Sequence, residues 1–265
     1  MRGGREGGGM ARGDELRKRL AAGDNLLAAW LTLCSNISAE IMGLAGFDVL
    51  IIDQEHGPGD LQNAVSLMQA VKAGGSAVCL MRLASGDLNL IKRALDTGVD
   101  GLMIPMIETA EQAKAVVAAC RLPPAGIRGI APGSVRAARY GLDRAGFIAA
   151  GGRDLFIICQ VETKATLDRI PAIASVEGVD MLFVGRNDLA SSIHRAGEMD
   201  HPEAKALLAD AEARIKATGK PLGGITAPGD DARALFARGH RLVIAGSDHT
   251  LLRDAALATV RGARA

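Results

Sequence analysis

Aromatic residues are scarce in this chain of 265 residues, which has one Trp, one Tyr and five Phe. Proteins that bind single-stranded nucleic acid stack bases on exposed aromatic rings, so this scarcity argues against that function. An excess of one charge is also missing, because 31 Lys and Arg residues oppose 30 Asp and Glu residues. A net charge of +1 gives no electrostatic reason to bind nucleic acid or an anionic membrane. We therefore expect neither partner.

Cysteine is also rare, and its four residues stand far apart in apolar runs without a C-x-x-C pair. This spacing disfavours zinc sites and disulfide frameworks, and we interpret the four residues as buried thiols of a protein in a reducing compartment. No run of 18 apolar residues is present, and no apolar stretch follows the N-terminal arginines as it does in a signal peptide. We expect a cytoplasmic protein.

Glycine is abundant, and six of the 33 glycines fall within residues 1–13. This stretch shows no apolar periodicity, so we expect a disordered N-terminal extension over 1–13. Average hydrophobic and charged content excludes disorder as the general state of the rest. We therefore place one folded domain over 14–265.

Short apolar runs alternate with longer amphipathic runs along this domain. The apolar runs predict eight strands, at 26–33, 47–53, 77–82, 101–106, 155–161, 181–184, 222–226 and 242–245. They are apolar almost throughout, as in parallel strands buried on both faces. Helices are predicted between them, at 60–73, 87–97, 110–119, 163–174, 202–218 and 230–238.

Eight strand–helix units in about 250 residues indicate an α/β fold of the (β/α)8 TIM-barrel type, as a single domain. A doubly wound open sheet is the rival fold. It would place a glycine-rich phosphate turn after the first strand, where this chain has Cys34-Ser35-Asn36-Ile37-Ser38. The absence of G-x-x-x-x-G-K-[ST] also excludes P-loop chemistry.

Polar residues follow several of the predicted strands, where a barrel of this type carries its active site. They are Asp53, Glu55 and His56 after the second strand, Arg82 after the third, Gln160 and Glu162 after the fifth, and Asn187 and Asp188 after the sixth. Two carboxylates on adjacent strands, without Cys or a His cluster, suit a hard divalent ion such as Mg, Mn or Co. Glu162 and Asp188 are the candidate pair, although either alone also suits a helix start.

His56 is the candidate general base, because an imidazole beside carboxylates can exchange protons near neutral pH. A hydrogen-bonded turn residue is the alternative. Arg82 keeps its charge and needs an anionic partner, which is either the substrate or a nearby acid such as Asp53. His249, after the last strand, is a weaker candidate. Asp96 has the pattern of an ordinary surface residue on a helix.

A long loop at 122–133 follows the predicted fourth-strand helix, and Arg136, Arg139 and Tyr140 come after it. Long loops in compact domains often cover or line a binding site. The arginines would then attract an acidic substrate. A solvated basic loop is the alternative.

Several strings resemble the HpcH/HpaI aldolase family, whose members are metal-dependent (class II) aldolases of pyruvate-type 2-oxo acids. They are F-D-V-L-I-I-D-Q-E-H at 47–56, P-P-A-G-I-R-G at 123–129, Q-V-E-T at 160–163 and V-E-G-V-D at 176–180. The resemblance runs from about residue 14 to 260 in the family's order and spacing. It implies pyruvate (or hydroxypyruvate) and an aldehyde as products of a 4-hydroxy-2-oxo acid, and no Schiff-base lysine.

The resemblance also implies roles for single residues. His56 matches the general base, Arg82 the arginine that stabilises the developing oxyanion, and Asp96 the acid that supports the histidine. This reading of Asp96 replaces the surface interpretation. The family's trimers or dimers of trimers imply a homotrimer or homohexamer, with the apolar C-terminal run 251–260 packed on a neighbour.

The binding residues follow in the same way. Gln160 matches a substrate-binding amide, Glu162 and Asp188 match the metal ligands, and Asp188 also contacts substrate. Asn187 stands where the family binds the substrate carboxylate through the backbone. The family string G-P-x-D reads Gly185-Arg186-Asn187-Asp188 here. We hypothesise that this polar pair favours hydroxylated donors or acceptors, unless Arg186 points outward to an acid on the rim.

Two other functions remain open at this point. One is a lyase of the same barrel type that cleaves an acyl-CoA, such as a malyl- or citramalyl-CoA. The other is a non-catalytic binding protein on a degenerate barrel, which retention of all five residues His56, Arg82, Gln160, Glu162 and Asp188 disfavours.

Overall fold

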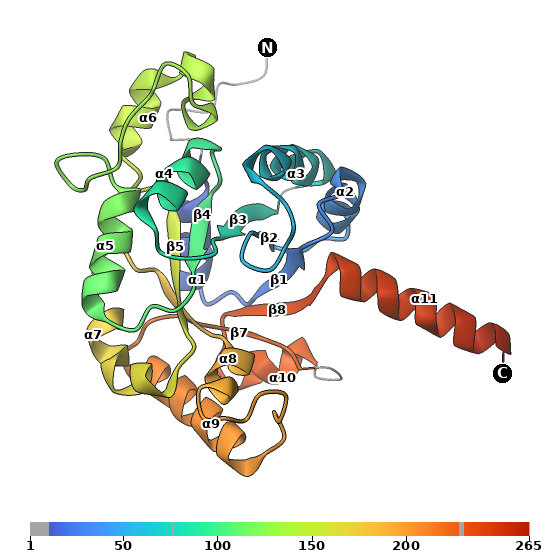
Figure 1. Cartoon of the computed structure of the whole chain (residues 1–265). Coiled ribbons are helices and arrows are strands. Elements are labelled where there is room, and N and C mark those ends of the chain that lie inside the picture. The colour runs from blue at the N-terminus through green and yellow to red at the C-terminus, as the bar shows by residue number, and fades with distance from the viewer. Residues whose placement is uncertain (1–10, 76, 228–230, 265) are drawn as a thin grey trace.

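A computed structural model describes residues 11–75, 77–227 and 231–264 of the chain. Eight parallel strands form one closed barrel in sequence order, surrounded by helices (Figure 1). The strands are β1 (Leu26–Leu31), β2 (Val49–Asp53), β3 (Val78–Arg82), β4 (Gly101–Ile104), β5 (Phe156–Val161), β6 (Met181–Val184), β7 (Leu222–Ile225) and β8 (Leu242–Ser247). Each overlaps a predicted strand, so the predicted (β/α)8 barrel is confirmed.

Side chains alternate between two buried layers along each strand. Ile51, Leu80 and Ile158 belong to the cluster inside the barrel, whereas Leu50 and Ile157 belong to the layer between strands and helices. This alternation follows from the two-residue period of a strand. Continued to the carboxyl ends, it turns the side chains at positions 30, 53, 82 and 160 toward the barrel axis.

The helices cover the barrel from outside, and their starts carry polar caps. The side chains of Asp60, Asp87 and Thr109 accept hydrogen bonds from first-turn N–H groups, as helix N-caps do. The helices are α1 (Gly13–Ala21), α2 (Asn36–Leu44), α3 (Leu61–Gly74), α4 (Leu88–Asp96), α5 (Ala110–Cys120), α6 (Arg144–Ala150), α7 (Ile170–Ala174), α8 (Arg186–Ser191), α9 (Pro202–Ala217), α10 (Ala232–Ala237) and α11 (Asp248–Arg264), with short 3-10 helices η1 (Arg136–Gly141) and η2 (Lys164–Arg169). Residue 230, the predicted start of α10, lies outside the described residues.

The predicted boundary of the N-terminal extension needs a correction at its end. Residues 1–10 lie outside the described residues, but 11–13 contact the barrel. The N–H of Arg12 donates to Asp100, and that of Gly13 donates to the carbonyl of Asp154. Helix α1 then places Leu16 in the inner cluster at the amino end of the barrel. The folded domain therefore includes residues 11–13.

The loop at 122–133 is also not where we predicted a lid. It follows α5 and precedes β5, so it belongs to the end of the barrel where strands begin. Its residue Arg128 pairs with Asp96, and Arg136 donates to the carbonyl of Thr97. The loop does not cover the active-site end of its own chain, because a loop from helix to strand lies at the opposite end of the barrel.

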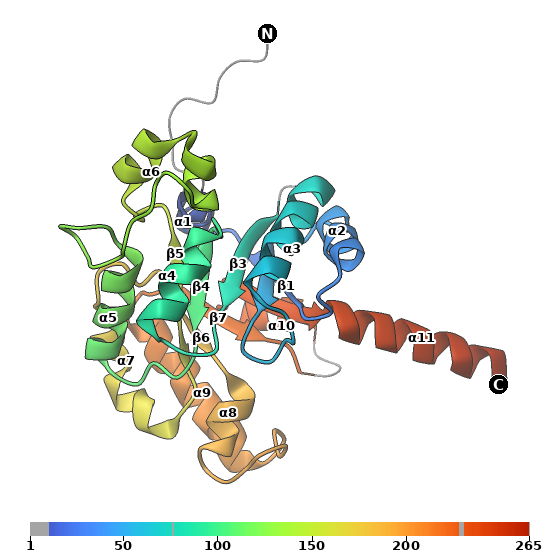
Figure 2. The same ribbon diagram turned by 45° about the horizontal axis from the view of Figure 1, so that its top comes forward.

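Helix α11 extends away from the barrel in both views (Figures 1 and 2). It contacts β1, β8 and α2 near its start. Four of its apolar side chains are at least 45% exposed: Leu251, Leu252, Leu257 and Val260. Within the described residues, no helix is long and apolar enough to cross a membrane.

Candidate active site

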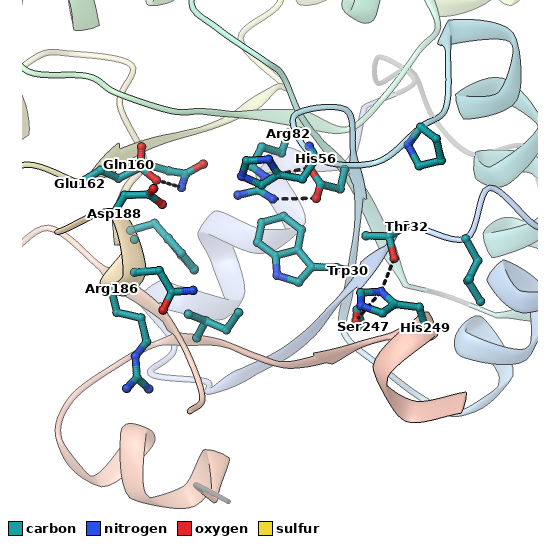
Figure 3. Close-up of a pocket in the computed structure, with 17 residues that line it drawn as sticks. Trp30, Thr32, His56, Arg82, Gln160, Glu162, Arg186, Asp188, Ser247 and His249 are labelled. Carbon is teal, nitrogen blue, oxygen red and sulfur yellow. Dashed lines mark hydrogen bonds and ion pairs between the residues drawn. The ribbon is translucent and has the colours of Figure 1, made fainter. Parts of the chain in front are cut away.

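A cavity of about 490 Å³ opens at the carboxyl ends of the strands (Figure 3). Its volume lies within the range of small-molecule sites. Six of the seven predicted site residues line it, which are His56, Arg82, Gln160, Glu162, Asn187 and Asp188. They come from the ends of β2, β3, β5 and β6, so the barrel brings together side chains up to 132 residues apart in the sequence (56 to 188).

Arg82 and Asp53 form a buried ion pair at the base of this cavity. The strand register sets them side by side, and Arg82 donates to Asp53 Oδ1 from Nε (2.9 Å) and to Oδ2 from Nη2 (2.7 Å). Burial opposes ionisation of Asp53, but the hydrogen bonds and charge of Arg82 outweigh it and lower its pKa. Of the two partners considered for Arg82, the structure shows the nearby acid.

Two further contacts fix the guanidinium of Arg82. Its Nη1 lies 3.0 Å from Glu55 Oε2, and its plane stands over the ring of Trp30, 4.1 Å from the ring centroid. A cation over the face of a Trp ring is attracted by the ring's quadrupole. Arg82 is therefore held on three sides, and it brings one fixed positive charge to a cavity rich in carboxylates.

His56 is positioned by the same aspartate that pairs with Arg82. Asp53 Oδ1 accepts the backbone N–H groups of Glu55 and His56, so the chain turns tightly after β2. Gly57 completes the turn, since a Cβ there would lie 2.2 Å from the carbonyl oxygen of Asp53. The turn leaves the imidazole of His56 exposed at the edge of the cavity.

Glu162 is a buried carboxylate with an unusual affinity for a proton. Its side chain accepts hydrogen bonds from the N–H of Met106 (2.8 Å) and from Nε2 of Gln160 (2.6 Å). Burial raises its pKa to about 7, and the charges of Asp188 and Glu55 add to this effect. Burial also raises the pKa of Glu55. Burial and the nearby carboxylates thus oppose the ionisation of Glu162 more than Arg82 favours it.

The donor set around Glu162 fits a hard divalent ion. Gln160 Oε1 is buried and accepts no hydrogen bond from the described residues, and amide and carboxylate oxygens are the ligands such ions take. Gly185 leaves the space beside the carboxylate open, because a Cβ there would lie 2.4 Å from Glu162 Oε1. The described residues hold no cluster of three or more His, Cys, Asp or Glu ligands. Glu162 and Asp188 would thus share the ion with water or substrate oxygens.

The two residues that depart from the family string differ in placement. Asn187 is exposed in the first turn of α8 and lines the cavity. The Arg186 side chain points away from Glu162 and Asp188 (Figure 3). Its charge acts on Asp200, whose pKa it helps to lower after the larger effect of Lys205. Arg186 also lines the cavity, so its direction away from Glu162 and Asp188 does not remove it from the site.

Asp96 is the one predicted site residue that the chain does not bring to the cavity. It ends α4, which runs back from the carboxyl end of β3 to the amino end of β4. There its Oδ1 accepts a 3.0 Å hydrogen bond from Arg128, a buried arginine that also lies over the ring of Phe147. A contact between Asp96 and His56 of the same chain is therefore ruled out by the topology.

Comparison with known proteins identifies the family of this chain. Residues 27–255 match the family model described as HpcH/HpaI aldolase/citrate lyase, which covers most of the chain. The chain belongs to this family. The HpcH/HpaI resemblance read from the sequence strings is confirmed.

Individual members of the HpcH/HpaI family align over most of their length. A 4-hydroxy-2-oxovalerate aldolase from Rhodococcus jostii is 38% identical, over 90% of this chain and 92% of its own. A 5-keto-4-deoxy-D-glucarate aldolase from Citrobacter koseri is 37% identical, over 91% and 93%. A solved structure of an HpcH/HpaI family protein from Burkholderia cenocepacia superimposes with a TM-score of 0.90 at 34% identity, over 95% of this chain and 99% of that one.

Several lining residues of this HpcH/HpaI site were missed by the sequence reasoning. Trp30 lies within an apolar strand, and its direction toward the barrel axis follows only from the strand period. Thr32 and Ser247 are small hydroxyl residues of ordinary loop type, and their contacts depend on β1 meeting β8. His249, the weaker candidate, lines the cavity between them.

Proposed function

We propose that the chain is a class II aldolase that cleaves a 4-hydroxy-2-oxo acid reversibly to pyruvate, or hydroxypyruvate, and an aldehyde. The observation that carries the proposal is the cavity, in which His56, Arg82 and the pair Glu162–Asp188 meet at one barrel end. The aldolase names of the relatives that align over about 90% of the chain support the same chemistry.

A divalent ion, Mg, Mn or Co, is the cofactor in this proposal. Glu162 and Asp188 would hold it, and Gln160 would bind the substrate beside it. When bound, such an ion acts as a Lewis acid that acidifies the methyl group next to the keto carbon of pyruvate. The backbone N–H of Asn187, in the first turn of α8 where N–H groups lack intrahelical partners, would bind the substrate carboxylate.

The chain's own residues then move the proton and stabilise the charge. In the direction of condensation, His56 or a water that it activates takes a proton from the methyl carbon. Arg82 stabilises the negative charge that develops on the keto oxygen, and its position is fixed in advance by Asp53 and Trp30. The new carbon–carbon bond forms to the aldehyde carbon, whose oxygen ends as the 4-hydroxyl.

The resemblance implies that Asp96 supports His56, and this role is possible only between two copies of the chain. Within one chain Asp96 lies at the opposite end of the barrel from His56. We propose that Asp96 supports His56 of a neighbouring copy, which requires the amino end of one barrel to face the carboxyl end of another. Such head-to-tail contacts close into rings, and a homotrimer is the smallest ring the family resemblance implies.

The projecting helix α11 supports assembly into a homotrimer or homohexamer. Its exposed apolar side chains continue onto α2, where Ile37, Ile41 and Leu44 are 58% to 73% exposed. Apolar surface of this extent is unusual on a monomer and is typical of an interface. Light scattering in solution measures the mass, and a strictly monomeric value would contradict the proposal. The cytoplasmic location remains a prediction.

Pyruvate release tests the proposed activity directly. The purified protein is supplied with Mg, Mn or Co and offered a panel of 4-hydroxy-2-oxo acids, with malyl-CoA as the alternative substrate. Metal-dependent pyruvate release from the panel supports the aldolase. Cleavage of the CoA ester alone would favour the acyl-CoA lyase, and no cleavage and no exchange of pyruvate methyl protons would favour a non-catalytic barrel.

A further inference from the structure

A second polar wall faces the carboxylates across the active-site cavity. It consists of Thr32, Ser247 and His249, which all line the same cavity. Nδ1 of His249 lies 2.6 Å from Thr32 Oγ1 and 3.0 Å from Ser247 Oγ. This group lies beyond Trp30 as seen from Glu162 and Asp188 (Figure 3). The chemistry proposed above makes no use of it.

The hydrogen bonds of Asp248 decide which nitrogen of His249 carries hydrogen. Asp248 is buried and accepts from the N–H groups of Thr32 and Leu33 and from the hydroxyl of Ser38. The single hydroxyl proton of Thr32 is donated to Asp248 Oδ1 at 2.9 Å. Thr32 Oγ1 can then only accept at its contact with His249, so Nδ1 of the imidazole is the donor.

This assignment leaves Nε2 of His249 as the nitrogen with a free lone pair. In a neutral imidazole one nitrogen donates and the other accepts. The contacts of His249 within the described residues are made by Nδ1 and the backbone, and no partner is shown for Nε2. The cavity wall therefore presents a hydrogen-bond acceptor on the far side of Trp30 from the proposed metal ligands Glu162 and Asp188.

We propose that Nε2 of His249 accepts a hydrogen bond from a hydroxyl group on the aldehyde half of the substrate. This inference rests on the proposed aldolase function and names its substrate class, which is 4-hydroxy-2-oxo acids with a further hydroxyl beyond C4. An apolar tail would leave Nε2 without a hydrogen-bond partner. A carboxylate would be repelled, because it and Nε2 are both hydrogen-bond acceptors. Thr32 and Asp248 are positioning residues, because they act on the substrate only through the imidazole.

Two aldehydes that differ in one group test the inference. Glycolaldehyde and propionaldehyde have a hydroxyl and a methyl group at the same position, and each is condensed with pyruvate. We expect the parent protein to prefer glycolaldehyde in kcat/KM. His249→Leu removes the acceptor and should lower this preference by about threefold to tenfold, the net effect of one hydrogen bond.

Further variants separate this role from a structural one. His249→Gln, whose amide oxygen can replace Nε2 as an acceptor, should keep part of the preference. Thr32→Val should lose it, because the imidazole is no longer held with hydrogen on Nδ1. His194→Asn replaces an exposed histidine outside the cavity and should leave the preference at the parental value.

The outcomes distinguish a failure of this inference from a failure of the proposed aldolase function. Metal-dependent exchange of pyruvate methyl protons is measured in the parent first, and its absence would overturn both. If the parent exchanges these protons and the preference is equal in the parent and in His249→Leu, the inference is wrong and the aldolase proposal stands. A preference that falls in His249→Leu and Thr32→Val but not in His194→Asn supports the inference.

Discussion

Arg82 has its charge balanced before any substrate arrives, since Asp53 holds it through two hydrogen bonds. A residue bound in this way loses little freedom when it stabilises a new negative charge. The sequence predicted an anionic partner for Arg82, either the substrate or a nearby acid, because a buried guanidinium cannot be neutralised. It could not predict the Trp30 contact, which depends on how β1 lies relative to β3 in the closed barrel.

The proposed metal ligands are testable residue by residue. Glu162→Gln and Asp188→Asn keep the shape of each side chain but remove the charge, so each should lower ion affinity. The loss should exceed the about 10–100-fold effect of removing an outer hydrogen-bond partner. Elemental analysis after dialysis against limiting Mn measures it.

Glu55→Gln is the control, because Glu55 contributes charge near the cavity but is assigned no bond to the ion. This variant should retain the ion. Full occupancy in Glu162→Gln and Asp188→Asn would reject the assignment.

A substitution of Asn187 tests whether the polar residues beside Asp188 affect the choice between hydroxypyruvate and pyruvate. Its side-chain amide can bond the extra hydroxyl of hydroxypyruvate, so Asn187→Ala should lower the kcat/KM ratio of hydroxypyruvate to pyruvate by about tenfold. Ser191→Ala, on the same helix, should not change the ratio. An unchanged ratio in Asn187→Ala would mean that the residue contributes its backbone alone.

At the level of elements, the sequence predicted the strands better than the helices. Buried parallel strands are apolar throughout, and all eight stood out on that basis. Helices α1 and α2 were missed because one begins in a glycine-rich segment and the other in a string read as a turn. Ser35, which caps α2, was the available signal. Helix α8 has only 6 residues, too few for a periodic pattern.

The junction of α9, α10 and β8 contains a buried histidine that should make stability depend on pH. His240 contacts the carbonyl of Leu235 through Nδ1, and its Nε2 lies 3.6 Å from Glu212. Burial lowers its pKa, as do the charges of Arg238 and Lys216, while Glu212 opposes them. The unfolded chain therefore binds this proton more readily, and stability should fall as pH drops below 6.5.

The size of this effect is limited to about 1.4 kcal/mol per pH unit for one proton. Urea denaturation at pH 7.5 and 5.5 measures it in the parent and in His240→Gln, which should lose less stability between these values. Glu212→Gln should lose more than the parent, because the charge that raises the pKa of His240 is gone. Equal losses in all three proteins would contradict the assignment.

At the level of the whole molecule, the family resemblance implied His56 and Asp96 as partners, although the predicted barrel already separates them. A helix that follows a barrel strand ends at the amino end of the barrel, so Asp96 at the end of the predicted helix 87–97 lies opposite the strand-end residue His56. The proposed pairing of His56 with Asp96 between copies therefore predicts a result in mixed oligomers that a pairing within one chain would not give.

Two variants that are inactive alone should regain activity when they are mixed in one oligomer. His56→Ala and Asp96→Ala each remove one partner, so a site is complete only where an intact His56 meets an intact Asp96 of the next copy. In random trimers about a quarter of the sites meet this condition, and co-expression should recover about that share of activity.

His56→Ala with Arg82→Ala is the control pair. Both residues belong to the same cavity of one chain, so their mixture should stay inactive. No recovery in the first mixture would return Asp96 to its pairing with Arg128 alone.

The proposed packing of helix α11 on a second copy predicts that folding of this protein depends on its concentration. Helices in proteins owe most of their stability to tertiary packing, and α11, with 17 residues, has few contacts with its own barrel. The barrel can collapse as a single chain in a first-order step, but a helix stabilised by a second copy must wait for an encounter. Refolding from denaturant should therefore show a late phase whose rate rises with protein concentration, and dilution should release the helix before the barrel unfolds.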